Sequence, residues 1–349
     1  MYAGVVHAPF DIRYEEIKTP EPQKGEVRIK VAFTGICGSD VPRVNGEACH
    51  YFPNILGHEF SGVIDKVGED VDPCKIGLKV AGIPLVPCMK CETCQKGDFS
   101  LCKNYSFIGS RQFGSFAEYV VVPEKNAFPL DESVSFEQGA LFEPSTIAVH
   151  ALRLIDFKGG KTVAVFGCGT IGLFLIQWCR ILGASRIVSI GRSKDRLPLA
   201  KRLGASETIS ILDDGAYEKA MDLTYGKGFD YIFDATGSAE MMKDEFKYAA
   251  NKAHICMVGT PKNNMAFTVS DWELMNRKEF MLTGSWMSYS APFPGEEWKL
   301  TEEFFKNGQL IYDKDMVDRI MGLSEIPDAF ELFKTPGLVK GKILIDSVR

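Results

Sequence analysis

The pattern of hydrophobic and polar residues divides the chain into two parts of different texture. In the first 145 residues, short runs rich in β-branched residues alternate with turns rich in Gly and Pro, as in EVRIKVAFTGI (26–36), FSGVIDKVGEDV (60–71) and SFAEYVVVPEKNAFPL (115–130). Many short strands separated in this way are typical of a β-rich, barrel-like domain. We therefore predict strands and turns for this part.

From Lys161 onward, strand-like and helix-like runs alternate: KTVAVFG (161–167), TIGLFLIQWCRILGA (170–184), SRIVSIG (185–191) and SKDRLPLAKRLGA (193–205). This alternation predicts βαβ units and a parallel sheet. The pattern fades after about Gly284, and the tail ends in a strand-like GKILIDSV. We expect an α/β protein in which a Rossmann-type, doubly wound domain (148–284) is inserted into a β-rich catalytic domain (1–147 and 285–349).

Composition excludes several classes of protein. The 349 residues are 45% hydrophobic with a net charge of -6, so there is no basic surface for nucleic acid. No apolar run approaches the roughly 18 residues of a membrane span, and the N-terminus lacks the pattern of a signal peptide. Ten cysteines without a secretion signal favour the cytoplasm and metal binding. Five of them are expected to be small packing residues: Cys49, Cys74, Cys168, Cys179 and Cys256.

Four of the cysteines form a metal-binding pattern. The run PCMKCETCQKGDFSLC has the spacing C-x2-C-x2-C-x7-C and contains Cys88, Cys91, Cys94 and Cys102. Four thiolates can surround one Zn²⁺ tetrahedrally, and such a site has no open position for a substrate. The pattern predicts a structural zinc ion; the alternative is a set of free thiols or disulfides.

A glycine-rich turn predicts a dinucleotide site. Gly167, Gly169 and Gly172 form G-x-G-x-x-G between an apolar strand and a helix that begins near Thr170 and Ile171. These glycines permit a tight turn, approach of the backbone to a pyrophosphate, and close packing of the helix on the sheet. The phosphates would lie at the helix N-terminus. The alternative is a glycine-rich turn in another kind of α/β protein.

The residues at the end of the next strand-like run, SRIVSIG, bear on whether the cofactor is NAD(H) or NADP(H). An NAD-binding protein normally presents Asp or Glu to the ribose here, whereas this chain has Gly191, followed by Arg192, Ser193 and Lys194. Gly191 leaves room and the cations could hold a 2′-phosphate, so we predict NADP(H) over NAD(H). In the alternative interpretation, Arg192 stacks on adenine and Asp195 binds the ribose.

A second group of residues predicts a catalytic metal. Cys37 lies in GICGSD, His58 and Glu59 lie in GHEFSG, and Glu143 lies in FEPST. A thiolate, an imidazole and a carboxylate can form an open Zn²⁺ site that polarises an alcohol oxygen. The sequence alone does not bring these segments together, and a lone His58 could equally be an ordinary core or surface histidine.

The motifs together resemble a known family. GHE followed by G-x5-G-x2-V (from Gly57 onward), the four-cysteine segment and the later glycine motif occur in the order found in the zinc-dependent medium-chain alcohol and polyol dehydrogenases. The resemblance spans the whole chain. It implies a GroES-like catalytic domain, a Rossmann domain, an active site between the two, hydride transfer to a nicotinamide, and a homodimer or homotetramer.

The resemblance also implies roles for individual residues. Cys37, His58 and Glu143 would bind the catalytic zinc, with Glu59 as an alternate or water-linked ligand, and the four-cysteine segment would bind one structural zinc. Ser39 would pass a proton outward from the reacting oxygen. Many members continue this relay with a histidine at the position of Pro42, so the proton route here departs from the family. The family resemblance by itself favours NAD(H).

Four segments resemble members that oxidise a polyol phosphate to a ketose phosphate: CGSDVPR, HYFPNILGHEFSG, YSFIGSR and GSWMSYSAPFPGEEW. Arg43 and Arg111 are candidates to bind the phosphate, although each could be an ordinary surface arginine. Trp286 and Tyr289 would line the site beyond the zinc or pack between the domains. The alternatives are an alcohol dehydrogenase for a simpler secondary alcohol and a non-catalytic dinucleotide sensor.

Overall fold

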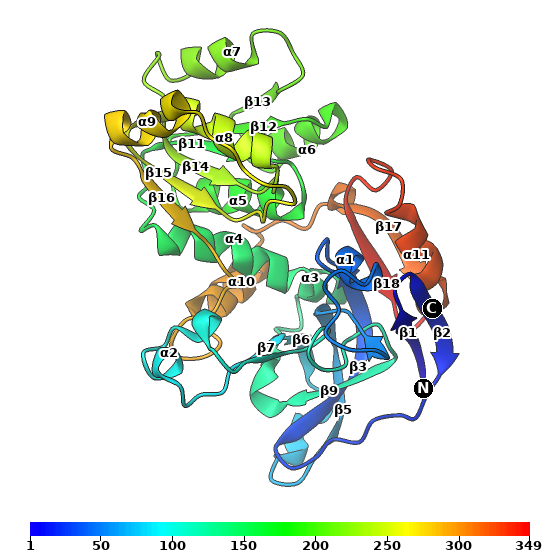
Figure 1. Ribbon diagram of the computed structural model, residues 1–349. Helices are drawn as coiled ribbons and strands as arrows, with labels where there is room; N and C mark the ends of the chain where they lie inside the picture. The colour runs from blue at the N-terminus through cyan, green and yellow to red at the C-terminus, as the bar shows by residue number, and fades with distance from the viewer. The chain divides into compact units, whose positions relative to one another are not determined.

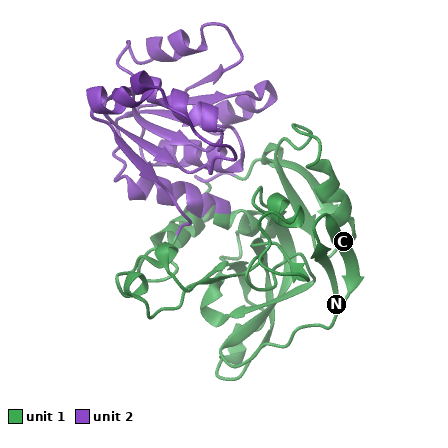
Figure 2. Ribbon diagram, viewed as in Figure 1, with its two compact units in different colours: residues 1–143, 289–308, 312–349 green, residues 144–288, 309–311 purple.

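A computed structural model describes residues 1–349, which form two compact units. Figure 2 colours these units separately. Unit 1 contains Met1–Glu143, Tyr289–Gly308 and Tyr312–Arg349, and unit 2 contains Pro144–Ser288 and Gln309–Ile311. No helix has both the length and the hydrophobicity that a membrane span requires.

Unit 1 is built on a sheet of seven strands (Figure 1). The strands follow the order β10 (Ala127–Pro129), β6 (Lys79–Gly82), β5 (Glu59–Val67), β3 (Glu26–Ile36), β18 (Lys342–Asp346) and β17 (Val317–Gly322), with β9 (Tyr119–Pro123) also paired to β3. In β3, the alternating residues Val27, Ile29 and Val31 are buried, and they form a core with β5 and β9. This period of two is what the sequence pattern predicts.

A smaller sheet and five helices complete unit 1. The second sheet has the order β2 (Asp11–Glu16), β1 (Tyr2–Ala8) and β4 (Asn54–Ile55), and a separate pair joins β7 (Leu85–Val86) to β8 (Ser106–Phe107). The helices are α1 (Asp40–Val44), α2 (Glu92–Gln95), α3 (Phe136–Ala140), α10 (Glu296–Lys306) and α11 (Ile326–Leu332). Residues of β1, α11 and β18 share a hydrophobic core, so the C-terminal segment packs against the N-terminal strand.

Unit 2 is a parallel six-stranded sheet. Its order is β13 (Glu207–Ser210), β12 (Arg186–Gly191), β11 (Thr162–Phe166), β14 (Phe229–Asp234), β15 (Ala249–Met257) and β16 (Met281–Gly284). Its helices are α5 (Thr170–Ile181), α6 (Leu197–Arg202), α7 (Ala216–Asp222), α8 (Ala239–Tyr248) and α9 (Val269–Lys278), together with most of α4 (Phe142–Leu154). Helices lie on both faces of this sheet (Figure 1), and the predicted α/β architecture is confirmed.

The first helix after the glycine motif differs from the expectation. The sequence predicts one buried face on α5, made of Ile171, Leu175, Ile176, Cys179 and Leu182. Instead, the residues from Gly172 to Cys179 are all buried and Leu182 is exposed. The side of α5 away from the sheet is covered within unit 2, where Trp178 donates a hydrogen bond of 3.2 Å from Nε1 to the carbonyl of Ser145.

The packing cysteines are predicted correctly only in part. Cys168, Cys179 and Cys256 are buried, but Cys49 is partly exposed and Cys74 is exposed. Cys74 lies in a short 3-10 turn whose backbone is fixed by a hydrogen bond of 2.9 Å from its amide to Asp72 Oδ1. That turn stands at the surface, so its side chain has no core to enter.

Candidate active site and metal centres

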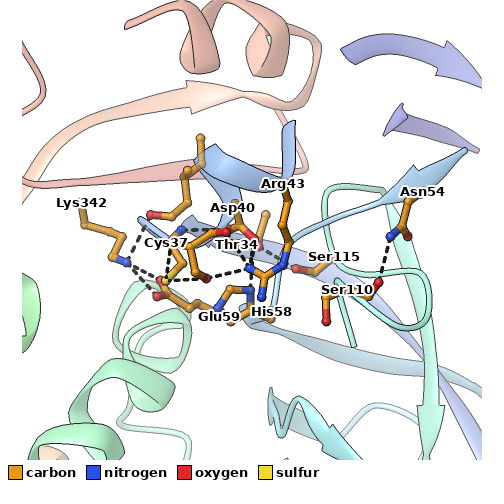
Figure 3. Close-up of polar contacts among 12 residues, drawn as sticks. Thr34, Cys37, Asp40, Arg43, Asn54, His58, Glu59, Ser110, Ser115 and Lys342 are labelled. Atoms are coloured by element: carbon orange, nitrogen blue, oxygen red, sulfur yellow. Dashed lines mark hydrogen bonds and ion pairs between the residues drawn. The ribbon is translucent and has the colours of Figure 1, made fainter. Parts of the chain in front are cut away.

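The end of strand β3 brings three distant segments together. Both β5 and β18 run antiparallel to β3, and Gly35 pairs with Glu59 while Ile36 pairs with Ile343. In antiparallel pairs, the first residues of one strand lie beside the last residues of the other. Cys37, which follows β3, therefore lies close to the beginnings of β5 and β18 (Figure 3).

Cys37, His58 and Glu59 form a compact set of possible metal ligands. Their ligand atoms all lie within 4.8 Å of one another, and His58 and Glu59 are buried. The preceding Gly57 has φ +91°, and a Cβ there would lie 2.6 Å from the ring of Phe116, so glycine is needed for this turn. Sulfur, nitrogen and oxygen donors at this separation fit a zinc ion.

The buried side chain of Asp40 orients two members of this set. Its Oδ2 accepts a hydrogen bond of 3.0 Å from the amide of Cys37, and its Oδ1 lies 3.3 Å from His58 Nδ1. Burial lowers the pKa of His58, but the Asp40 carboxylate and the Cys37 thiol together outweigh that effect and raise it well above its usual value. Because Nδ1 faces Asp40, Nε2 is the nitrogen left for a metal, as in carboxylate–histidine–zinc arrangements.

A buried ion pair, which the sequence analysis missed, anchors Glu59. Lys342 Nζ lies 2.8 Å from Glu59 Oε1 and 2.6 Å from Oε2, and it donates a hydrogen bond of 3.2 Å to the carbonyl of Ile36. Burial lowers the pKa of Lys342, but the carboxylate of Glu59 and the thiol of Cys37 raise it overall. The signal in the sequence was a lysine that begins the otherwise apolar strand KILID.

Glu143 lies near this set but outside its compact group. It is the second residue of α4 and its side chain is partly buried; loss of solvent raises its pKa to about 7, while the charge of His58 acts in the opposite direction. The structure therefore gathers Glu59, rather than Glu143, with Cys37 and His58. Glu143 remains within electrostatic reach of His58 and Glu59.

Ser39 and Arg43 lie next to Cys37. The Ser39 hydroxyl donates a hydrogen bond of 3.3 Å to Cys37 Sγ. Arg43 Nη1 donates to Ser39 Oγ at 2.8 Å and to its carbonyl at 2.7 Å, and it lies 3.6 Å from Asp40 Oδ1. Part of the Arg43 guanidinium thus holds the serine in place.

The other predicted substrate residues have different environments. Arg111 is exposed, and its guanidinium lies 4.5 Å from the centre of the Tyr105 ring. Trp286, in unit 2, is 52% exposed. Tyr289 is buried in unit 1, where its hydroxyl accepts a hydrogen bond of 3.4 Å from the amide of Leu85. The environment of Tyr289 is that of a packing residue.

The four cysteines predicted to bind a structural metal also converge. The Sγ atoms of Cys88, Cys91, Cys94 and Cys102 lie within 4.8 Å of one another, and none is in a disulfide. Hydrogen bonds from the Thr93 hydroxyl and from backbone amides lower the pKa of Cys91 to about 5, whereas burial raises the pKa of Cys94 to about 12. Four sulfurs supported by backbone N–H groups fit a tetrathiolate zinc site.

The glycine motif has the geometry that a dinucleotide requires. Gly167, after β11, has φ +100°, and a Cβ on Gly172 would lie 1.9 Å from the Gly167 carbonyl oxygen. No atom lies within 4 Å of a Cβ placed on Gly169, so the backbone there is open to a ligand at the start of α5. Thr170 and Ile171 form the first turn of that helix.

The segment predicted to select the cofactor follows β12. A Cβ on Gly191 would lie 2.7 Å from Cys168 Sγ, so an acidic residue there would require the thiol to move. Arg192, Ser193 and Lys194 are exposed, and Lys194 Nζ lies 2.6 Å from Asp213 Oδ1. The positive charge of Lys194 is therefore partly balanced, whereas no carboxylate lies within ion-pair distance of Arg192.

The chain is similar to known dehydrogenases along its whole length. Residues 23–132 match the alcohol dehydrogenase GroES-like domain, and residues 170–306 match the zinc-binding dehydrogenase domain. The chain is 39% identical over 300 residues to galactitol 1-phosphate 5-dehydrogenase of Escherichia coli K12, covering 86% of this chain and 87% of that one. It is also 33% identical over 269 residues to sorbitol dehydrogenase of Bacillus subtilis, covering 76% of each.

Solved structures agree with these relatives. A crystal structure of galactitol-1-phosphate dehydrogenase from Escherichia coli matches 99% of this chain and 100% of its own, with a TM-score of 0.94 and 35% identity. A zinc-binding dehydrogenase from Sinorhizobium meliloti 1021 bound to NADP and a short chain alcohol dehydrogenase from Escherichia coli CFT073 complexed with NADH each match 99% of both chains, with a TM-score of 0.89 and 28% identity. This chain belongs to the zinc-binding dehydrogenases that combine a GroES-like domain with a Rossmann-type domain.

Proposed function

We propose that this protein transfers a hydride reversibly between a nicotinamide cofactor and a secondary hydroxyl of a polyol or polyol phosphate. The proposed reaction resembles that of galactitol 1-phosphate 5-dehydrogenase, which would give a ketose phosphate. The observation that carries this proposal is the buried set of Cys37, His58 and Glu59 with Asp40 behind it. An open site of this donor type is suited to an alcohol oxygen.

Each residue of the site has a distinct role in this proposal. A zinc ion held by Cys37, His58 and one of the carboxylates, Glu59 or Glu143, would act as a Lewis acid toward the substrate oxygen. Asp40 fixes the imidazole and the backbone of Cys37. Lys342 balances the charge of Glu59.

In this proposal Ser39 carries the proton away from the reacting oxygen. Its hydroxyl is already oriented toward Cys37 Sγ by the hydrogen bond from Arg43. Pro42 has no side-chain donor or acceptor with which to continue a relay. We propose that Ser39 passes the proton to water rather than to a second side chain.

We further propose that the catalytic domain is 1–147 with 285–349, that 148–284 binds the dinucleotide, and that NADP(H) is preferred. The absence of an acid at Gly191 and the uncompensated charge of Arg192 support NADP(H), and the ion pair of Lys194 with Asp213 weakens that support. Related structures contain both cofactors. We also propose Trp286 as a substrate contact, because an indole that is 52% exposed is available to a ligand.

A homodimer or homotetramer in the cytoplasm is also proposed. Strand β16 is at the edge of its sheet, and its Met281 and Leu282 are 54% and 42% exposed, which supports association with another copy. All ten cysteines are free, as is usual in a reducing compartment. Light scattering of the purified protein tests the assembly, and a monomer would contradict it.

The decisive experiment combines metal analysis with a panel of substrates. We expect two zinc ions per chain and oxidation of polyols or polyol phosphates with at least one nicotinamide cofactor. Activity on simple secondary alcohols alone would favour the alternative alcohol dehydrogenase. One zinc ion per chain and no turnover of any alcohol would contradict the proposal and favour a dinucleotide sensor.

A further inference from the structure

Three basic side chains come from separate segments of unit 1 that lie near Ser39. Arg43 lies in α1, His50 in the loop that follows, and Arg111 in the loop after β8. His50 was not singled out from the sequence. Partial burial lowers its pKa, and the charges of Arg111 and Arg43 lower it further, so both guanidinium groups lie within electrostatic reach of its ring.

Hydrogen bonds fix the two loops side by side. The buried Asn54 donates a hydrogen bond of 3.0 Å from Nδ2 to the carbonyl of Ser110, which directly precedes Arg111 (Figure 3). The Gly114 amide donates another, of 2.7 Å, to the carbonyl of Ile55. The segment that follows His50 is therefore hydrogen-bonded to residues on both sides of Arg111. These bonds fix the backbone on which Arg111 lies.

The charge of this cluster is poorly balanced. Asp40 is the carboxylate nearest to Arg43, at 3.6 Å, and it is already engaged with Cys37 and His58. No carboxylate lies within ion-pair distance of His50 or Arg111. The two guanidinium groups keep the histidine neutral, and an anion bound among the three side chains would balance the guanidinium charge and favour a protonated imidazole.

We infer that Arg43, His50 and Arg111 form a subsite for the phosphate group of the substrate, an inference that rests on the proposed function. Guanidinium groups bind phosphate oxygens through charge-assisted, often bidentate, hydrogen bonds. Arg43 is separated from Cys37 Sγ only by the Ser39 hydroxyl. The subsite thus lies beside the proposed reaction centre, where a phosphate several carbon atoms from the reacting hydroxyl would be held.

The test compares Arg111→Ala and His50→Gln with the wild type. The measured quantity is kcat/KM for galactitol 1-phosphate divided by kcat/KM for unphosphorylated galactitol. We expect this ratio to fall about tenfold or more in each variant, because Arg111→Ala removes a charge-assisted hydrogen bond to phosphate and His50→Gln removes an imidazole that bound phosphate would protonate. Inorganic phosphate should inhibit the wild type in competition with the substrate and should inhibit both variants more weakly. Arg13→Ala is the matched control, since Arg13 is exposed and pairs with Asp11 away from the cluster.

The outcomes separate this inference from the function on which it rests. An active wild type whose ratio and phosphate inhibition are the same in Arg111→Ala, His50→Gln and Arg13→Ala would overturn the subsite and leave the dehydrogenase intact. A wild type that oxidises no polyol or polyol phosphate would instead overturn the proposed function. Unchanged zinc content and melting temperature in the two variants would show that a lower ratio reflects the subsite and not a damaged fold.

Discussion

The two candidate metal centres of unit 1 differ in how the chain builds them. The closed group, Cys88 to Cys102, comes from 15 consecutive residues and includes two partly exposed cysteines. The open group takes Cys37 from the end of β3 and His58 and Glu59 from the start of β5, and it is backed by Lys342 at the start of β18. The first depends on local spacing and the second on the register of a sheet.

The groups that surround the two candidate metal centres also differ: one is supported by nearby backbone and the other by side chains from distant segments. In the closed group, the sulfurs are supported by backbone amides and the Thr93 hydroxyl. In the open group, buried side chains of opposite charge surround the ligands, and the pKa of Glu143 is raised to about 7 by burial. Strongly shifted pKa values in a buried cluster are typical of functional sites. We therefore expect the closed group to contribute stability and the open group to contribute chemistry.

The largest effect is expected from removing a ligand of the open group. His58→Ala should lower kcat/KM by more than about 10⁴-fold, because Lewis-acid assistance is worth several kcal/mol. The melting temperature should change little by comparison. Steady-state kinetics and thermal denaturation check both parts, and substantial residual activity would show that the chemistry resides elsewhere.

The converse variant is Cys94→Ser in the closed group. We expect the first unfolding transition to fall by roughly 10 °C, because loss of a metal site is among the most destabilising changes. Measured below that transition, activity should persist. Loss of hydride transfer with an unchanged fold and an unchanged zinc content at the open group would contradict this division of roles.

The ion pair behind the open group should matter for stability. Lys342→Met leaves the buried Glu59 carboxylate without its partner and should reduce the free energy of unfolding by roughly 3–4 kcal/mol. Urea denaturation measures this change. The double variant Lys342→Met/Glu59→Gln should recover much of the loss, and equal losses in both variants would mean that the pair is not the cause.

The metal-free protein should be less stable at pH 8 than at pH 5.5. The pKa of Glu143 is raised to about 7 in the folded state, so folding favours its protonated form, and this contribution is lost as the pH rises toward 7. The loss should be at most about 3 kcal/mol. The measurement is the difference in the free energy of unfolding between the two pH values. Glu143→Gln should reduce this dependence, and an unchanged slope would contradict the assignment.

The smallest effect is expected on cofactor preference, from a substitution in unit 2, which contains neither metal group. Gly191→Asp should shift the ratio of kcat/KM for NADP to that for NAD about tenfold toward NAD, because a carboxylate repels a 2′-phosphate. Gly191→Ala is the control, since it crowds Cys168 Sγ equally at Cβ but adds no charge. Equal shifts in both variants would indicate a steric effect only.

Much of the architecture could be predicted from the sequence because its signals are local. The strand Glu26–Ile36 has the bounds expected from its alternating pattern, and β11, α5 and β12 follow in the predicted order. The short strands β4 and β13 carry no comparable pattern, and their pairing partners give them their structure. The burial of α5 on more than one face also depends on α4, because Trp178 of α5 is hydrogen-bonded to Ser145 of α4. The periodicity within α5 alone cannot record this contact.

The sequence by itself determined the four-cysteine group, the glycine turn and the residue types available for an open metal site, because each depends on spacing or side-chain chemistry. Only the tertiary structure decided which of them meet. Strand register placed Glu59 and Lys342 beside Cys37, burial made Asp40 a partner of His58, and the tie between two loops put His50 near Arg111. Contacts between residues far apart in the chain follow from the folding of the whole unit, which no local pattern records.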